Sequence, residues 1–256
     1  YDADRFVLKY TGGYSEFDFE LDYDADGIRS VDSGLDWSQL LFLGTPVSEL
    51  TGYTRTPSDL TRPFFQKSEF QSHELQMTTQ LDGSVNFISG LYYYTSEEDQ
   101  GLSFIENNSD LVDIYRYFGS FIDGPVSDEG YLFRGQASLE TTSYAVYSQI
   151  NWDVTANTVL TAGVRYSYDE KKGSDNTFVQ WVGDPDDPTV FRNTENDWDQ
   201  VTWRLGVDHF LAEDHFLYAF VATGYRSGGF NLMAPTSTTD VGEVEPEELI
   251  GDSAEG

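Results

Sequence analysis

The chain of 256 residues contains no cysteine. This absence excludes disulfides, thiol nucleophiles, zinc–thiolate sites and iron–sulfur clusters. Basic residues are also scarce, with 14 Lys and Arg against 45 Asp and Glu, which gives a formal net charge of −31. Nucleic acid is therefore not an expected partner, because binding to phosphates needs a basic surface. No run of about 18 apolar residues occurs, so the sequence predicts no transmembrane helix.

Aromatic residues, in contrast, are abundant in an otherwise polar chain. The mean hydropathy is −0.45, yet 16% of the residues are Phe, Trp or Tyr. Such a composition suits strands that turn one apolar face to lipid and carry aromatic girdles at the membrane interface. It also suits a secreted β-sandwich that binds polysaccharide through its aromatic side chains. Composition alone leaves both classes open.

Apolar and polar residues alternate over several long segments, which indicates strands with one apolar face. Even positions are mostly apolar in residues 144–152 and 160–168, and odd positions are apolar in residues 201–207. We expect strands at residues 5–23, 66–81, 84–98, 138–153, 158–172, 200–211 and 215–227, with residues 241–250 as a candidate for one more. The strand count is thus about seven or eight.

Short and long connections alternate between these strands. Asp82-Gly83 is typical of a two-residue hairpin, and Ala212-Glu213-Asp214 forms another short connection. Between the hairpins we expect long polar loops: residues 25–62, about 39 residues from Gln100, and about 26 residues from Gly173. This alternation is typical of an outer-membrane barrel with short periplasmic turns and long extracellular loops. The expected fold is all-β: an antiparallel transmembrane β-barrel wall segment with up-and-down strands.

No sequence motif predicts catalysis, a cofactor or a metal site. A serine-hydrolase elbow, a P-loop, a dinucleotide fingerprint and H-E-x-x-H are all absent. We therefore expect no enzyme activity and assign no catalytic, cofactor-binding or metal-binding residues. His209 and His215, each preceded by an Asp, could bind a divalent metal. The alternation places His209 with the apolar set, so we favour a structural role.

The segment IYRYFGSF, in the loop expected after Gln100, offers the best candidates for contact with an apolar or stacking ligand. These candidates are Tyr115, Tyr117, Phe118 and Phe121. We favour the alternative that these rings pack against the rest of the loop at the barrel rim. Ligand-binding residues are therefore left unassigned.

Three sequence elements follow one another in a specific order. They are SYAVY from Ser143, LTAGVRY from Leu160, and GYRSGGFN from Gly224. Their order and spacing resemble the barrel of TonB-dependent outer-membrane receptors, in which S-Y-A-x-[FY], L-T-x-G-x-R-Y and [SR]-G-[YF]-[KR]-x-G-G-[FY]-N recur. FQSHELQMTTQLDGSVNFISGLYYYTSEED, from Phe70, resembles another strand pair of that family. The resemblance extends over most of residues 5–250.

The resemblance implies that residues 224–231 form the upper end of a wall strand. Glycines at that point would allow bends where the strand leaves regular pairing. Arg226 is expected in the polar lumen or at the surface, because a lipid-facing arginine at mid-membrane costs about 2–4 kcal/mol.

The resemblance also implies a function. Members of the family are ligand-gated active transporters of the bacterial outer membrane, in which a 22-stranded barrel encloses an N-terminal plug. Their ligands are typically ferric siderophores, haem, cobalamin or saccharides, and import is energised through TonB. We expect residues 1–256 to be a partial barrel domain of such a receptor, siderophore or iron-complex receptor-like, without the plug, the TonB box or the C-terminal strands. Expected partners are outer-membrane lipid, the plug domain and TonB complex of the full-length protein, and a small ligand such as a ferric siderophore.

Two alternatives remain open. A self-contained outer-membrane barrel of about eight strands, serving as an anchor or adhesin, would close on itself. A secreted polysaccharide-binding β-sandwich would have two packed sheets and connections of similar length at both ends.

Overall fold

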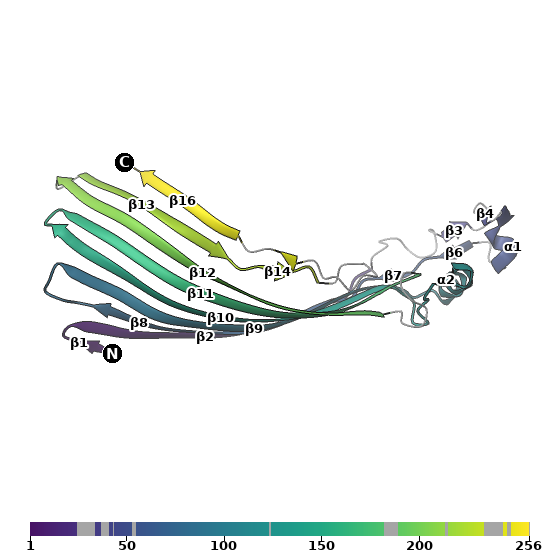
Figure 1. The fold of residues 1–256 in the computed structure, drawn as a ribbon. Helices are drawn as coiled ribbons and strands as arrows, with labels where there is room; N and C mark the ends of the chain where they lie inside the picture. The colour runs from purple at the N-terminus through teal and green to yellow at the C-terminus, as the bar shows by residue number, and fades with distance from the viewer. Residues whose placement is uncertain are drawn as a thin grey trace.

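The computed structural model describes residues 1–24, 34–36, 41–42, 44–52, 55–122, 124–181, 189–212, 215–232, 243–244 and 247–255. Its main feature is a single curved antiparallel sheet with the strand order β1-β2-β8-β9-β10-β11-β12-β13-β16, and with β7 beside β9 (Figure 1). The strands of this sheet are β1 (Asp2–Ala3), β2 (Phe6–Leu21), β7 (Leu60–Thr61), β8 (Phe64–Thr79), β9 (Val85–Glu106), β10 (Tyr131–Thr155), β11 (Thr158–Val179), β12 (Thr189–Ala212), β13 (His215–Arg226) and β16 (Glu247–Glu255).

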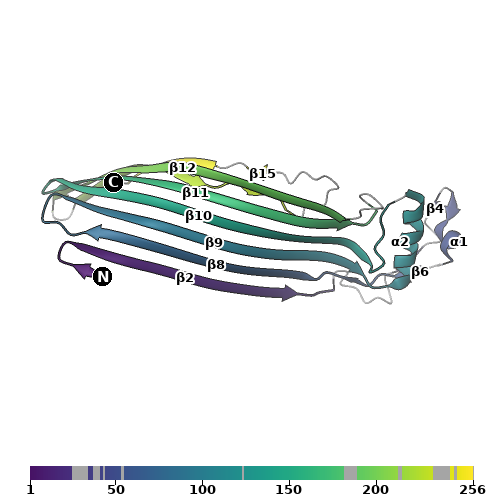
Figure 2. The same cartoon turned by 60° about the horizontal axis from the view of Figure 1, so that its bottom comes forward.

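Smaller elements gather away from the hairpin turns. The remaining elements are helices α1 (Val47–Thr51) and α2 (Ser109–Ile122), and three two-stranded sheets: β3 (Gly34–Asp36) with β6 (Arg55–Pro57), β4 (Leu41–Phe42) with β5 (Thr45–Pro46), and β14 (Gly229–Phe230) with β15 (Glu243–Val244). Both helices lie at the end of the sheet opposite the hairpin turns (Figures 1 and 2). No helix in the described part of the chain is long and apolar enough to cross a membrane.

The architecture confirms the predicted up-and-down antiparallel sheet. The long strands β2 and β8 to β13 follow one another in chain order, and β16 adds one more strand at Glu247–Glu255 instead of at the expected residues 241–250. The described residues form no second sheet packed on the first, so the β-sandwich alternative is wrong. Nor does the described sheet close, because no pairing joins β1 or β2 to β16.

Two predicted loop lengths are wrong. Strand β9 continues to Glu106 and β10 begins at Tyr131, so the connection expected to run about 39 residues covers only residues 107–130 and contains α2. Strand β11 continues to Val179 and β12 begins at Thr189, which shortens the next loop in the same way. Both extensions mix polar and apolar residues without a regular period, so they lack the apolar alternation that marks a lipid-facing strand.

One face of the sheet carries a continuous row of exposed apolar residues. Cross-strand partners lie on the same face of a sheet, and consecutive pairings link six residues across six strands. These residues are Tyr10, Leu75, Leu91, Val146, Tyr166 and Val201. All six are 40% exposed or more, far more than the side chains of a buried core, and Val201 reaches 52%. We call this side the outer face.

Further exposed apolar residues extend the row into a belt on the outer face. They include Tyr144, Ile150, Trp152, Leu160, Val164, Trp203, Leu205, Val207 and Leu217. On β10 the belt runs from Tyr144 to Trp152, which matches the 9–11 residues that a tilted strand needs to cross a bilayer. Tyrosines gather at its upper edge, where the Tyr144 ring lies 5.2 Å from Tyr93 and 6.4 Å from Tyr168. We call this surface the lipid-facing belt.

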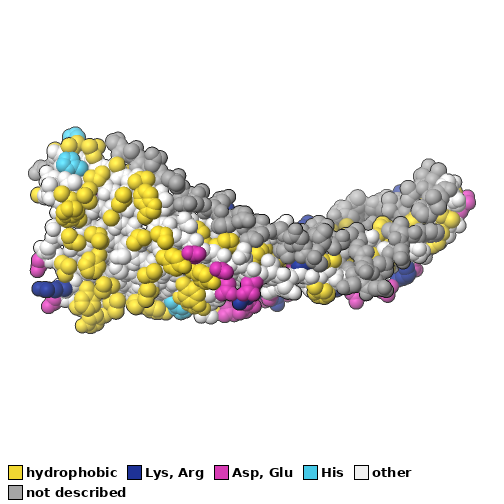
Figure 3. Space-filling model, viewed as in Figure 1, with side chains coloured by type: hydrophobic (Ala, Val, Ile, Leu, Met, Phe, Trp, Pro, Cys, Tyr) yellow, Lys and Arg dark blue, Asp and Glu magenta, His cyan; other side chains and the backbone are white. Residues whose placement is uncertain are grey.

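A row of charged side chains lies on the outer face beyond the tyrosines. Register pairs Glu16, Glu69, Glu97, Glu140, Lys172 and Glu195 across six strands. Figure 3 shows the hydrophobic side chains over the half of the sheet with the hairpin turns and the acidic ones at the end of that patch. Lys172 offsets part of the repulsion by pairing with Glu170 at 2.8 Å and Glu195 at 3.2 Å. Charge thus begins where the tyrosine girdle ends.

The belt can be tested with one arginine on each face of β12. In the intact protein in lipid vesicles, Leu205→Arg is expected to lower the free energy of unfolding by about 2–4 kcal/mol, because it places a charge in lipid. Thr202→Arg, on the opposite face of the same strand, should change it by less than about 1 kcal/mol. Urea titration of both variants measures the difference, and equal losses would contradict the assignment of the faces.

Candidate ligand-facing surface

The face opposite the belt, the inner face, is polar, and its side chains bind one another. The Tyr147 hydroxyl donates to Glu74 Oε1 at 2.7 Å and accepts from Gln76 Nε2 at 3.1 Å. The Arg165 guanidinium lies 5.5 Å from the centre of the Tyr92 ring and 5.9 Å from that of Tyr147. These contacts join β8, β9, β10 and β11 into one fixed polar surface.

Two arginines on this surface have no acidic partner. Arg165 Nε donates to Ser167 Oγ at 3.0 Å, and Arg204 lies 4.5 Å over the Phe220 ring. Neither makes an ion pair within the described residues. Together with Glu74 they line an open cavity of about 370 Å³. Two stacked guanidinium groups at one cavity can meet an anionic ligand, since stacking fixes the side chain and leaves its donors available.

The segment after β13 crosses the inner face. Lys171 Nζ donates to the Gly228 carbonyl at 2.7 Å, and the Phe230 ring lies 5.8 Å from the buried Trp198 ring. Burial lowers the pKa of Lys171, which lies beyond the tyrosine edge of the belt. Strand β13 ends at Arg226, so the chain leaves regular pairing within residues 224–231, as expected from the glycines there, and it turns inward to place Phe230 against Trp198.

Arg226, the last residue of β13, is exposed. Strand β13 pairs with β12 only as far as Ala222, so Arg226 lies beyond the part of the strand that this ladder fixes. An exposed position at this end of the strand agrees with the prediction, which placed Arg226 in the polar lumen or at the surface.

The aromatic candidates of the IYRYFGSF segment lie on α2 and mostly pack internally. Tyr115 and Phe118 pack against a small core formed by Val47, Leu111 and Ile114. Trp181 Nε1 donates to the Tyr115 carbonyl at 3.0 Å, and the two rings meet edge to face. Burial raises the pKa of the Tyr115 hydroxyl. Tyr115 and Phe118 therefore pack against neighbouring residues of the loops, as the favoured alternative expected.

The other two aromatic candidates, Tyr117 and Phe121, lie on the same helix. The Tyr117 ring lies 5.9 Å from that of Phe118 and is half-buried. Phe121 belongs to α2, and its side chain lies outside the described residues. The sequence analysis predicted a loop and not helix α2 here, although the apolar residues of this segment recur at helical spacing.

A buried carboxylate holds two of the upper loops together. Glu106 is only 2% exposed. It accepts hydrogen bonds from Ser58 Oγ at 2.7 Å and from the backbone nitrogens of Asp59 and Asn108, both at 2.9 Å. Asn108 Nδ2 adds a bond to the Pro57 carbonyl at 2.8 Å. Sequence reasoning missed this residue, because nothing separates Glu106 from the other acidic residues before the loops are brought together.

The two histidines occupy structural positions. His209 Nδ1 lies 2.9 Å from Thr158 Oγ1, and its pairing with Leu217 places it on the outer face. His215 is an exposed residue at the start of β13, and Asp214 lies outside the described residues. No group of three or more potential metal ligands occurs among the residues that the structure describes.

The sequence matches the family model "TonB dependent receptor-like, beta-barrel" over residues 1–250. The chain belongs to this family. This TonB-dependent receptor barrel therefore lies in the outer membrane, with the belt toward lipid and the inner face toward the lumen.

Individual relatives agree with this assignment. The pesticin receptor of Yersinia pestis is 32% identical over 116 residues, which cover 45% of this chain and 16% of that protein. The pesticin receptor of Yersinia enterocolitica is 31% identical over the same length. The crystal structure of the ferric yersiniabactin uptake receptor FyuA from Yersinia pestis matches 98% of this chain with a TM-score of 0.67 at 18% identity, and shares its fold. The matched region spans 16% of the curated relatives and 30% of that crystallised chain.

The role of Glu106 can be tested by hydrogen exchange on the intact protein. Glu106→Ala leaves three donors without their acceptor, so the local opening free energy at residues 55–61 and 107–118 should fall by about 3 kcal/mol. Amide exchange there should accelerate on the order of a hundredfold, while the β10–β11 ladder stays protected. Glu129→Ala, an exposed acid of the same connection, is the control and should leave exchange unchanged. Unchanged protection in Glu106→Ala would contradict the proposed role.

Proposed function

We propose that the intact protein is a ligand-gated active transporter that imports a ferric siderophore or a similarly scarce nutrient, energised through TonB. Residues 1–256 would supply a partial barrel domain, an arc of the transporter wall. Family membership supports this proposal, as do the names of the relatives, which include a ferric yersiniabactin uptake receptor.

The observation that carries the proposal furthest is the pair of unpaired guanidinium groups on the inner face. Arg165 and Arg204 lie on neighbouring strands beside one cavity, each stacked on an aromatic ring. Many iron chelates carry anionic oxygen donors, which guanidinium groups recognise through paired hydrogen bonds. Arg165 pairs with Tyr147 across the ladder, so an anionic chelate in the lumen would meet these groups beside the fixed Glu74–Tyr147 network.

The proposed mechanism involves binding and gating. The upper loops and the lumen capture the ligand, and a plug domain then rearranges when the TonB complex of the inner membrane delivers energy. Differential affinity of the ligand for the closed and open states is what such gating requires. No bond is made or broken in the ligand, in keeping with a family of receptors, not enzymes.

Iron uptake by cells that depend on this receptor tests the proposal. Cells carrying the wild type should accumulate radiolabelled iron from at least one of a panel of ferric catecholate, hydroxamate and carboxylate chelates. Loss of TonB should abolish uptake and leave binding intact. Uptake that persists without TonB would contradict active transport.

Charge substitutions then locate the ligand path. Arg165→Gln and Arg204→Gln should each weaken chelate binding on the order of tenfold, because each removes a charged hydrogen-bond donor. Lys172→Gln removes a cation from the outer face and serves as the matched control, with no expected change. Equal binding by all three variants would remove Arg165 and Arg204 from the ligand path.

A further inference from the structure

Glu74 and Arg165 line the same luminal cavity without forming an ion pair. Glu74 belongs to β8 and Arg165 to β11. The Arg165 guanidinium nevertheless lies 5.5 Å from the centre of the Tyr92 ring, and Tyr92 is the cross-strand partner of Glu74. No ion pair among the described residues joins the two charges. Another group must therefore hold them apart.

The side chain of Tyr147 contacts both charges. Its hydroxyl donates to Glu74 Oε1 at 2.7 Å and accepts from Gln76 Nε2 at 3.1 Å. The Arg165 guanidinium lies 5.9 Å from the centre of its ring. A hydrogen bond from a hydroxyl stabilises a carboxylate in its charged form without a cation. Tyr147 thus binds Glu74 at its hydroxyl end and contacts Arg165 through its ring.

A glycine on the neighbouring strand allows Tyr147 to take this position. Gly90 on β9 is the register partner of Tyr147, and Gln76 on β8 is the register partner of Gly90. The ring therefore crosses β9 to reach β8. A Cβ atom at Gly90 would lie 2.5 Å from the Tyr147 hydroxyl oxygen. Only glycine leaves room for this close approach.

The Arg165 side chain is fixed on its other sides as well. Its Nε donates to Ser167 Oγ at 3.0 Å. Ala145, only 7% exposed, is the register partner of both Tyr92 and Ser167, so a small side chain lies where Arg165 extends across β10. The Nη atoms of Arg165 make no hydrogen bond to a described residue, and they remain available to an anion in the cavity.

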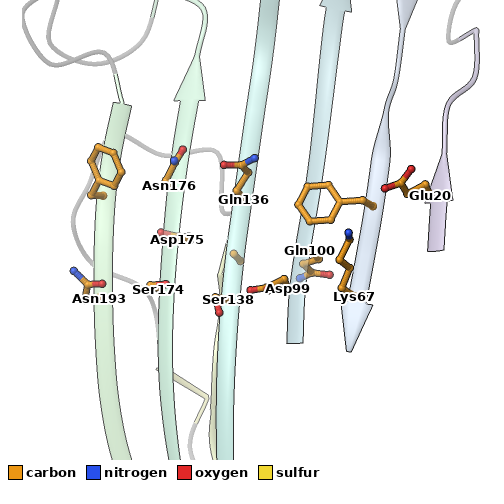
Figure 4. A pocket seen from close by; sticks show the side chains of 13 residues that line it. Glu20, Lys67, Asp99, Gln100, Gln136, Ser138, Ser174, Asp175, Asn176 and Asn193 are labelled. Atoms are coloured by element: carbon orange, nitrogen blue, oxygen red, sulfur yellow. The ribbon is translucent and has the colours of Figure 1, made fainter. Parts of the chain in front are cut away.

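Cations and carboxylates on neighbouring strands pair elsewhere in this sheet. Lys67 lies 3.5 Å from its register partner Asp18, and Arg192 pairs with its register partner Asp175. Figure 4 shows one member of each pair, Lys67 and Asp175, at the same pocket. A guanidinium that reaches a carboxylate is thus expected to pair with it unless another group intervenes.

We propose that Tyr147 is a positioning residue that keeps Glu74 and Arg165 apart, so that the Arg165 guanidinium stays available to an anionic ligand. The inference rests on the proposed function for the nature of that ligand. Without the Tyr147 ring, Arg165 pairs with Glu74, and the cavity loses a binding group although both charges remain. A shorter side chain at position 147 therefore enlarges the cavity and lowers its affinity for anions.

Chemical modification of Arg165 in the intact receptor tests this proposal without a ligand. Phenylglyoxal reacts with the neutral form of a guanidine, which a carboxylate partner disfavours. Tyr147→Ser should lower the rate at Arg165 about tenfold, although it removes a ring that shields the side chain. Glu74→Gln added to Tyr147→Ser should restore the wild-type rate, because no carboxylate is left to pair. Tyr147→Phe, which keeps the ring, should react at close to the wild-type rate. Peptide mass spectrometry measures each rate.

Arg204 is the internal control, because it lines the same cavity and stacks on Phe220 instead. Its rate should be the same in all variants. A faster reaction of Arg165 in Tyr147→Ser would show that the ring only shields it, and would overturn the proposal. A slow reaction that Glu74→Gln does not restore would assign Arg165 a different partner. An unreactive Arg165 in the wild type would show that another part of the intact receptor already occupies it, with the same consequence.

Binding of the ferric carboxylate chelate to the same variants connects the position of Arg165 to the proposed function. Tyr147→Ser should weaken binding about tenfold, and the added Glu74→Gln should recover most of that loss. Such a rescue is not expected from a residue that only supports the wall. A wild-type receptor that does not bind this chelate would count against an anionic ligand, whereas the modification rates would still decide whether Tyr147 separates the charges.

Discussion

The structure depends on the rule that backbone amides inside a bilayer must find their partners within the protein. Strands β10 and β11 meet this rule with a ladder that runs from Phe133 and Val179 down to the turn at Thr155 and Thr158, with a single irregularity near the turn. Such a ladder fixes the register, and the register fixes which face every side chain takes. A slip of one residue would move Arg165 into lipid and Tyr166 into the lumen.

Along each long strand the outer face passes through three environments in succession: lipid, the membrane interface and water. Near the turns the outer face is apolar, at the tyrosines it becomes amphipathic, and beyond them it is charged or polar. Inner-face polar groups satisfy one another, as Tyr147 and Glu74 do, so the lumen keeps a defined shape. On the outer face of the same ladder, Asn176 Oδ1 has no hydrogen-bond partner. The difference between these two polar surfaces is therefore set by side chains and not by the backbone.

The sequence predicted the strands best in the parts that face lipid, where apolar and polar residues alternate regularly. Alternation located β10 and β11 around residues 144–152 and 160–168, because one face there must be apolar. It failed at residues 100–106 and 173–179, where water on both sides allows either face to be polar and leaves no period to read. The inward turn after Arg226 and the buried Glu106 were missed for another reason. Each depends on a contact with a residue far away in the chain.

The net charge of the chain does not describe the charge of its luminal face. A value of −31 suggests a protein that repels anions. Many carboxylates, however, lie in the outer row, and three of the inner face are engaged: Glu74 accepts from Tyr147, Asp169 from Ser143, and Asp175 binds Arg192. Because salt screens exposed charges beyond about 8–10 Å, an anion in this cavity would respond mainly to the nearby Arg165, Arg204 and Glu74, and less to carboxylates across the wall. The sheet thus separates an acidic exterior from a surface that can receive an anion.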